Sequence, residues 1–178
     1  MRFLSAFVAV ALIGSSLTAA DAPVDRDNKP IPAPAELAKL TGDAAKGQAS
    51  FAPLCGICHQ VNGVGIDFGP NLSEVGSRKT KELIAESILD PSKVIEPGFE
   101  AVMIKLESDE TAMGIVAAET DTEVTVKAMG GAKTTFKKAD IVSRTKQPMS
   151  MMPVGLYRAL STEDLVNVVE FLSQQKKK

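Results

Sequence analysis

The chain has 178 residues, of which 44% are hydrophobic and 24% charged, with 20 basic and 22 acidic side chains. This length suits one domain, or one domain with an elaboration, and the composition is typical of a globular protein rather than a disordered one. The slight excess of acidic residues gives no support to nucleic-acid binding. With 7 Phe, 1 Tyr and no Trp, the chain has few large rings to fill a core. A buried apolar cofactor would supply the missing bulk.

Residues 1–20 have the pattern of a secretory signal peptide. Arg2 gives a positive start, the segment 3–17 is almost wholly apolar, and small residues at 18–20 offer a cleavage site. About 15 apolar residues are fewer than the ~20 that a spanning helix needs. We therefore expect cleavage before Asp21, export to the periplasm or beyond, and no transmembrane segment in the mature chain. Cleavage would remove one basic residue, Arg2, and no acidic one, so the mature chain would have 19 basic and 22 acidic residues.

Residues 21–40 predict an extended linker before a domain at 41–178. Four prolines lie among charged and small residues in the stretch 21–34, and proline cannot sit inside a helix. A first helix is expected to begin near Asp43, a plausible N-cap, and to run toward Cys55. Gly47 in this helix is either a liability of about 0.5–1 kcal/mol relative to alanine or a point where another helix crosses closely.

Two further helices are predicted from their apolar spacing. Residues 80–89 place three side chains on one helical face before the stop at Asp90-Pro91: Leu83, Ile84 and Ile88. In the last helix Ser161 can cap the amide of Asp164, and Leu160 and Leu165 are spaced as a hydrophobic staple. Its apolar residues repeat at i, i+3, i+4 and i+7: Leu165, Val168, Val169 and Leu172. One face of this helix must therefore be buried.

Between these helices, residues 99–146 alternate polar side chains with apolar and β-branched ones. Turn signals at 108–109, 120–121 and 130–131 divide the region into four or five short strands. We expect one continuous antiparallel sheet within 98–147, packed beside the helical domain because its apolar face must be buried. The predicted fold class is α+β, a mainly α domain with a small antiparallel β insertion at about 98–147.

The segment 55–59, Cys-Gly-Ile-Cys-His, contains both cysteines and the only histidine of the chain. This C-x-x-C-H pattern is that of haem attachment. Two thiols three positions apart on a turning backbone can each add to a vinyl group of one porphyrin, while the next side chain swings onto the iron. Cys55 and Cys58 are therefore candidates for covalent attachment of one haem c, and His59 for an iron ligand.

Three other functions use similar residues. A dithiol oxidoreductase needs C-x-x-C after a strand of a thioredoxin-like sheet, whereas here a helix precedes it. An exported disulfide between Cys55 and Cys58 is compatible with an oxidising compartment. A zinc site normally needs four ligands, and this segment offers three with no further Cys or His in the chain. We favour haem over all three.

The sixth iron ligand has to be Met, Lys, water or nothing, because the chain has no second histidine. Met is favoured because a thioether opposite imidazole is the usual pair of an electron carrier. Three methionines in the strand region are expected to fill a core: Met103, Met113 and Met129. Three others lie in a short loop before the last helix: Met149, Met151 and Met152. Met152 is preferred because Pro153 stiffens the loop beside it, but the register among these three stays open.

These segments resemble class I cytochrome c. The resemblance rests on these residues and segments: Gly42-Asp43, Gly47, Phe51, 55–60, 69–72 and Met152-Pro153. More narrowly, the segments 88–92, 95–100 and 150–156 resemble the C-terminal haem-binding domain of planctomycete and verrucomicrobial proteins. The resemblance covers about residues 41–175 and implies a mainly α cytochrome c-like haem domain.

The resemblance also implies roles for individual residues. The carbonyl of Pro70 would accept a hydrogen bond from Nδ1 of His59, although a Gly-Pro pair is also an ordinary turn. Gly47 and Phe51 would pack on the last helix near Val169 and Leu172. Such haem domains commonly end large exported proteins with dehydrogenase-like propellers, so here the electron donor is expected to be a separate chain.

Three functions compete on these observations. The favoured one is a mobile electron carrier, not an enzyme, between an exported dehydrogenase and a terminal acceptor, with no nucleic-acid partner. A haem-based sensor or enzyme would need an open or labile sixth position, and no second histidine could serve as its acid–base group. In the third, the β insertion would bind a partner and haem would be structural.

Overall fold

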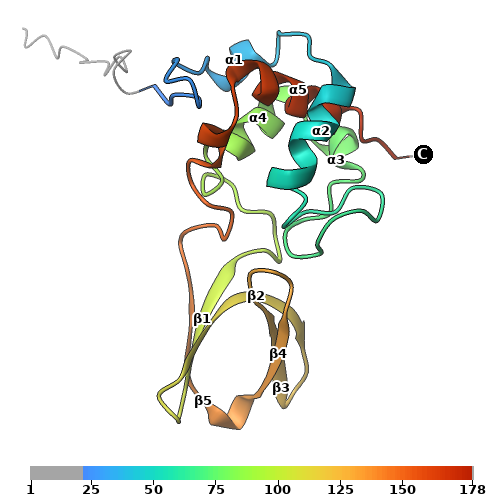
Figure 1. Cartoon of the computed structure of the whole chain (residues 1–178). Coiled ribbons are helices and arrows are strands. Elements are labelled where there is room, and N and C mark those ends of the chain that lie inside the picture. Colours follow the sequence, from blue (N-terminus) through green and yellow to red (C-terminus); the bar gives the residue numbers. More distant parts are fainter. Residues whose placement is uncertain (1–21, 178) are drawn as a thin grey trace, which may run out of the picture.

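The structure is a computed structural model that describes residues 22–177, so the expected signal peptide at 1–20 lies outside the described residues. The helices are α1 (Pro34–Leu37), α2 (Ala44–Leu54), α3 (Val75–Arg78), α4 (Lys81–Leu89) and α5 (Thr162–Ser173), with the short 3-10 helices η2 (Lys138–Asp140) and η3 (Leu156–Ala159). The strands are β1 (Ala101–Leu106), β2 (Thr111–Glu119), β3 (Glu123–Lys127), β4 (Lys133–Lys137) and β5 (Ile141–Lys146). The α-helices form one part of the molecule and the strands another (Figure 1). None of the helices in the described range has the length and apolar character to span a membrane.

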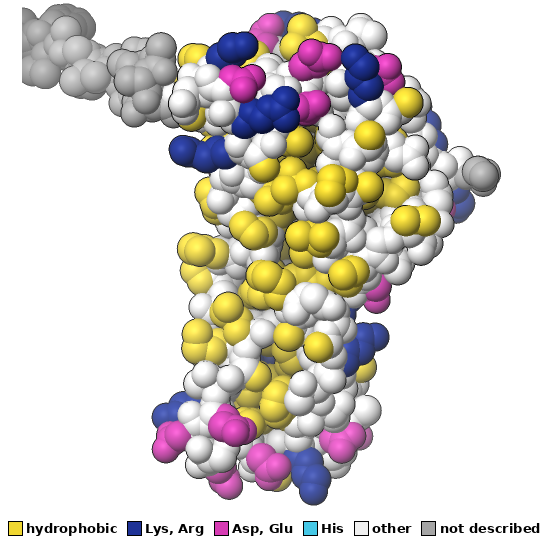
Figure 2. All heavy atoms as spheres, in the orientation of Figure 1, with side chains coloured by type: hydrophobic (Ala, Val, Ile, Leu, Met, Phe, Trp, Pro, Cys, Tyr) yellow, Lys and Arg dark blue, Asp and Glu magenta, His cyan; other side chains and the backbone are white. Residues whose placement is uncertain are grey.

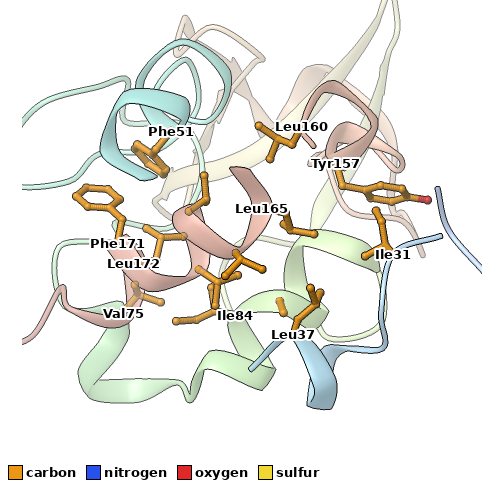
Figure 3. Close-up of a cluster of buried hydrophobic side chains, with 14 of the residues drawn as sticks. Ile31, Leu37, Phe51, Val75, Ile84, Tyr157, Leu160, Leu165, Phe171 and Leu172 are labelled. Atoms are coloured by element: carbon orange, nitrogen blue, oxygen red, sulfur yellow. The ribbon is translucent and has the colours of Figure 1, made fainter. Parts of the chain in front are cut away.

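The helical part is built around α5. Its predicted apolar face is buried, with Leu165 and Val168 0% exposed, and its capping box between Ser161 and Asp164 is present. Leu165 points into the same cluster as Leu37 of α1, and Ile84 of α4 lies nearby (Figure 3). Helices from both ends of the sequence therefore share one core.

Gly47 marks the crossing of α2 over α5. A Cβ added there would lie 1.9 Å from the backbone oxygen of Asn167, so only glycine allows this approach. The ring of Phe51 lies 5.5 Å from that of Phe171, measured between centroids, and Figure 3 shows the two rings together. The expected packing of α2 on the last helix is therefore present: Phe51 shares its core with Val169 and Leu172, and the closest approach of Gly47 is to Asn167 and Phe171.

The helix predicted at 80–89 is present as α4, and the Thr80 side chain accepts a hydrogen bond from the amide of Leu83. Ile84 faces the core, but Leu83 is 46% exposed, so its assignment to the buried face is wrong. Ala85 is buried in its place. The buried face of α4 is therefore rotated from Leu83 toward Ala85, whose small side chain lets the helix approach its neighbours closely.

The prediction of an extended linker at 21–40 is wrong for the described part of that segment. Val24 and Pro30 form a β-bridge, and α1 begins with Pro34, a position where proline is tolerated. Ile31 and Leu37 are 4% and 1% exposed and belong to the helical core. The prolines ended regular structure without preventing the apolar residues between them from packing.

Asp25 fastens this segment to α5. Its side chain, in a residue 3% exposed, accepts hydrogen bonds from the amides of Asp27, Lys29 and Thr162 and from the Thr162 hydroxyl, at 2.8–2.9 Å. These donors, the amide of Lys29 foremost, lower the pKa of Asp25 to about 2. The carboxylate thus also serves as an anion at the N-terminus of α5.

We expect Asp25→Ala to lower the melting temperature by several degrees at neutral pH. Because the folded pKa of about 2 lies below the ordinary 3.8, this stabilisation is complete above pH 3.8 and is lost as the pH falls toward 2. Thermal melts from pH 7 to pH 2 should therefore show the two proteins converging in acid. Asp27→Ala, whose side chain is 48% exposed, is the control. A difference that stays constant down to pH 2 would contradict the assignment.

The predicted antiparallel sheet is present, with strand order β4-β3-β2-β1-β5. It curves on itself (Figure 1), helped by register shifts after Lys105 in β1 and Val116 in β2. The curvature buries a second cluster inside the sheet: Val102, Ile104, Val124 and Val126. The apolar side chains on the inner face of the sheet therefore pack largely against one another. One end of the sheet contacts the helical part.

Candidate functional site

The C-terminus of α2 presents the C-x-x-C-H segment. Cys55 caps this helix, and its carbonyl accepts hydrogen bonds from the amides of Cys58 at 3.0 Å and His59 at 2.9 Å. This tight turn brings two thiols and the imidazole to one side of the helix end. Both cysteines are free thiols, so the structure gives no support to the alternative of a disulfide between them.

The environment of the two thiols also bears on the dithiol alternative. Burial, together with the neighbouring Cys58, raises the pKa of Cys55 to about 12, and burial also raises the pKa of Cys58. A redox-active dithiol needs a thiolate stabilised near neutral pH. These two cysteines follow a helix and are in an apolar site, which disfavours thiol–disulfide exchange and suits attachment to an apolar group.

His59 is held in one orientation. Its Nδ1 lies 2.8 Å from the carbonyl oxygen of Pro70, so Nδ1–H donates there and Nε2 keeps a free electron pair. Burial lowers the pKa of His59, which the Pro70 contact only partly offsets, so the site favours the neutral ring. Gly69 lies against the ring, because a Cβ at that position would be 2.6 Å from Cε1. An imidazole oriented in this way has the donor atom that a metal ligand needs.

Two adjoining hollows meet at His59, with empty volumes of about 820 and 700 Å³ including the parts open to solvent. They share six lining residues: Cys55, His59, Pro70, Phe99, Ser150 and Met152. Most other lining side chains are apolar, as in sites for large cofactors. Figure 2 shows apolar side chains gathered between the helical part and the sheet, with charged side chains toward the two ends.

Met152 is the best placed of the three candidate loop methionines. It lines both hollows, Met151 lines one, and Met149 is 62% exposed and lines neither. The Ser150 hydroxyl accepts a hydrogen bond from the Met152 amide, and the Ser150 amide donates to Ser92 beyond α4. The loop is thereby tied to the helical part at the position of the candidate ligand.

The three methionines of the sheet do not fill its core, contrary to expectation. Met103, Met113 and Met129 are 41%, 51% and 58% exposed. Met103 and Met113 are opposite one another in the β1–β2 ladder, and the alternate positions that point inward carry valine and isoleucine. Met129, in the turn between β3 and β4, lines one of the hollows instead.

Sequence reasoning missed two other residues of this site. Ile115 of β2 lines the same hollow as Met129, so the sheet contributes directly to the wall around His59. Lys79 is the only basic side chain lining either hollow in the described residues, and its ammonium lies 3.3 Å from the Ser87 hydroxyl. Their signal in the sequence is weak, because both depend on how distant segments meet.

Comparison with known proteins agrees with this geometry. Residues 44–124 match the model of the Cytochrome c family. The matched range contains Cys55, Cys58, His59 and Pro70 and ends before Met152. A comparison with curated proteins finds no match. Proteins of this family carry covalently attached haem, and the cofactor of the C-x-x-C-H segment is accordingly haem c.

Proposed function

We propose that this chain, whose residues 44–124 match the Cytochrome c family, is an exported single-haem electron carrier with His/Met coordination. One observation carries the proposal. The only histidine and Met152 line the same apolar hollows as Cys55, next to the thiol of Cys58. Together these residues would supply the two iron ligands and two attachment points that an electron-carrying haem c requires.

Each residue has a separate task in this proposal. Cys55 and Cys58 bind the porphyrin covalently, and haem, when bound, supplies a one-electron couple. His59 donates from Nε2, and its bond to the Pro70 carbonyl strengthens that donation. Met152 contributes a thioether that favours the ferrous state and raises the potential.

The lining of the hollows favours electron transfer over substrate turnover. Its apolar side chains exclude water, which keeps reorganisation small and leaves little polar surface to bind a substrate. Lys79 offers a positive charge at the wall of one hollow, where it can pair with a carboxylate of the porphyrin. The chain's single histidine is engaged in the site, so it offers no second imidazole for peroxide chemistry.

The partners follow from this chemistry. We propose an exported dehydrogenase on a separate chain as electron donor and a terminal redox protein as acceptor. The segments 88–92, 95–100 and 150–156 support the narrower likeness to planctomycete and verrucomicrobial haem domains, and the apolar start of the chain supports export.

Potentiometric titration of the purified holoprotein tests the carrier function. We expect one reversible one-electron transition, unchanged over repeated cycles, and no catalytic consumption of peroxide. Sustained peroxide turnover, or a transition that is displaced when a gaseous ligand is added, would instead identify an enzyme or sensor.

A further inference from the structure

The contact between the sheet and the helical part includes an ion pair in which the lysine is buried and the aspartate is largely exposed. Lys127, the last residue of β3, is 7% exposed, and its ammonium lies 3.2 Å from a carboxylate oxygen of Asp67. Burying an ammonium is costly unless it is paired, so this lysine depends on its partner. The Asp67 side chain is 60% exposed, which leaves the pair at the edge of the interface.

Asp67 begins the short loop that holds His59. The carbonyl of Cys58 accepts hydrogen bonds from the amides of Phe68 at 3.2 Å and Gly69 at 2.7 Å. Gly69 then lies against the imidazole, and the carbonyl of Pro70 is 2.8 Å from its Nδ1. The segment 67–70 therefore holds the backbone at Cys58, packs against one face of the His59 ring and accepts the hydrogen bond from its Nδ1.

The near end of the sheet supports the same loop through apolar contacts. Ile115 is opposite Lys127 in the β2–β3 ladder and is 4% exposed. It lines a hollow together with Phe68, which is 2% exposed. A Cβ added at Gly131 would lie 3.2 Å from Cγ2 of Ile66. Lys127 thus adds a directional contact between charged groups to these apolar contacts.

We propose that Lys127 is a positioning residue: through Asp67 it holds the loop 67–70 against His59, so that the β insertion sets the orientation of the proximal ligand. This inference rests on the proposed function. It gives the insertion a role within the carrier itself, because a looser loop weakens the bond from Nδ1 to Pro70 and changes how strongly the imidazole donates to iron.

Two variants of the holoprotein test the role. Lys127→Met and Asp67→Asn should each speed hydrogen exchange at the amides of Phe68 and Gly69 by about tenfold or more, because local opening becomes easier. Lys127→Arg should restore slow exchange. Lys133→Met is the matched control, since Lys133 is opposite Lys127 in the β3–β4 ladder, is exposed and makes no ion pair with residues 22–177.

Exchange of the imidazole proton, measured beside the reduction potential, separates positioning from a plain charge effect. Loss of a nearby cation alone lowers the potential and loss of a nearby anion alone raises it. If the pair acts by position, Asp67→Asn and Lys127→Met, compared with Lys127→Arg, should both weaken the ring's bond to Pro70, seen as faster exchange of the imidazole Nδ1 proton in NMR spectra. Unchanged loop and ring exchange together with potential shifts of opposite sign would overturn the proposal.

The two readouts also keep this inference apart from the proposed function. Faster loop exchange in a protein without a reversible one-electron couple would support the positioning role and contradict the carrier function. A reversible couple together with unchanged loop exchange in Asp67→Asn would support the carrier function and contradict the positioning role. Asn is tolerated at position 67 because the site is exposed. Circular dichroism checks that Lys127→Met still folds.

Discussion

Replacing both Cys55 and Cys58 by alanine is expected to leave almost no holoprotein after export. Each thiol supplies one of the two covalent attachments, and without them the haem is held only by ligation and apolar contacts. The unmodified protein should have the mass of the chain from about Asp21 plus one haem, and acidified organic solvent should fail to extract its pigment.

Replacing only one of the two cysteines should cause a smaller loss of holoprotein than replacing both. Cys55→Ala and Cys58→Ala should each retain a weaker attachment and yield less holoprotein than the unmodified chain. Met149→Ala, at an exposed position outside the hollows, is the control for expression and export. Pigment that acidified solvent extracts from the unmodified protein would refute covalent attachment.

Met152→Ala should have the largest effect on the redox properties. If Met152 is the proposed thioether ligand, its loss would remove a group that stabilises the ferrous state, and the potential should fall by roughly 0.1 V or more within the ~0.8 V over which axial ligands act. The near-infrared sulfur-to-iron charge-transfer band should disappear. Both changes follow from the position of Met152 in the wall of both hollows.

The neighbouring methionines provide matched controls for register. Met149→Ala should leave the band unchanged, because Met149 lines neither hollow. Met151→Ala should also keep the band, although Met151 lines one hollow and its loss can shift the potential slightly. If Met151→Ala alone removes the band, the ligand is one residue earlier and the carrier function stands.

The parts of the fold that could be predicted from sequence are those set by local patterns. The caps at Asp43 and Ser161 and the apolar face of α5 depend on residues a few positions apart, and all are present. The five-stranded sheet followed from alternation and turn residues in the same way. The C-x-x-C-H segment is also local, so its chemistry could be inferred from the order of its residues alone.

Predictions failed where distant segments meet. The segment around Ile31 and Leu37 was expected to be a linker, because its prolines are visible locally while the core that buries its apolar residues comes from α4 and α5. The sheet methionines were expected inside, but β-branched residues occupy the interior of the curved sheet. Lys127 and Asp67 are 60 positions apart, and no local pattern signals their pairing.

The most direct test of the electron-carrier proposal is a near-infrared and carbon monoxide measurement on the unmodified protein at neutral pH. If His59 and Met152 both bind the iron, the oxidised protein shows the sulfur-to-iron band and the reduced protein does not take up carbon monoxide readily. Absence of the band together with ready carbon monoxide binding would mean that the sixth position is open or labile, and the electron-carrier proposal would give way to a sensor or enzyme.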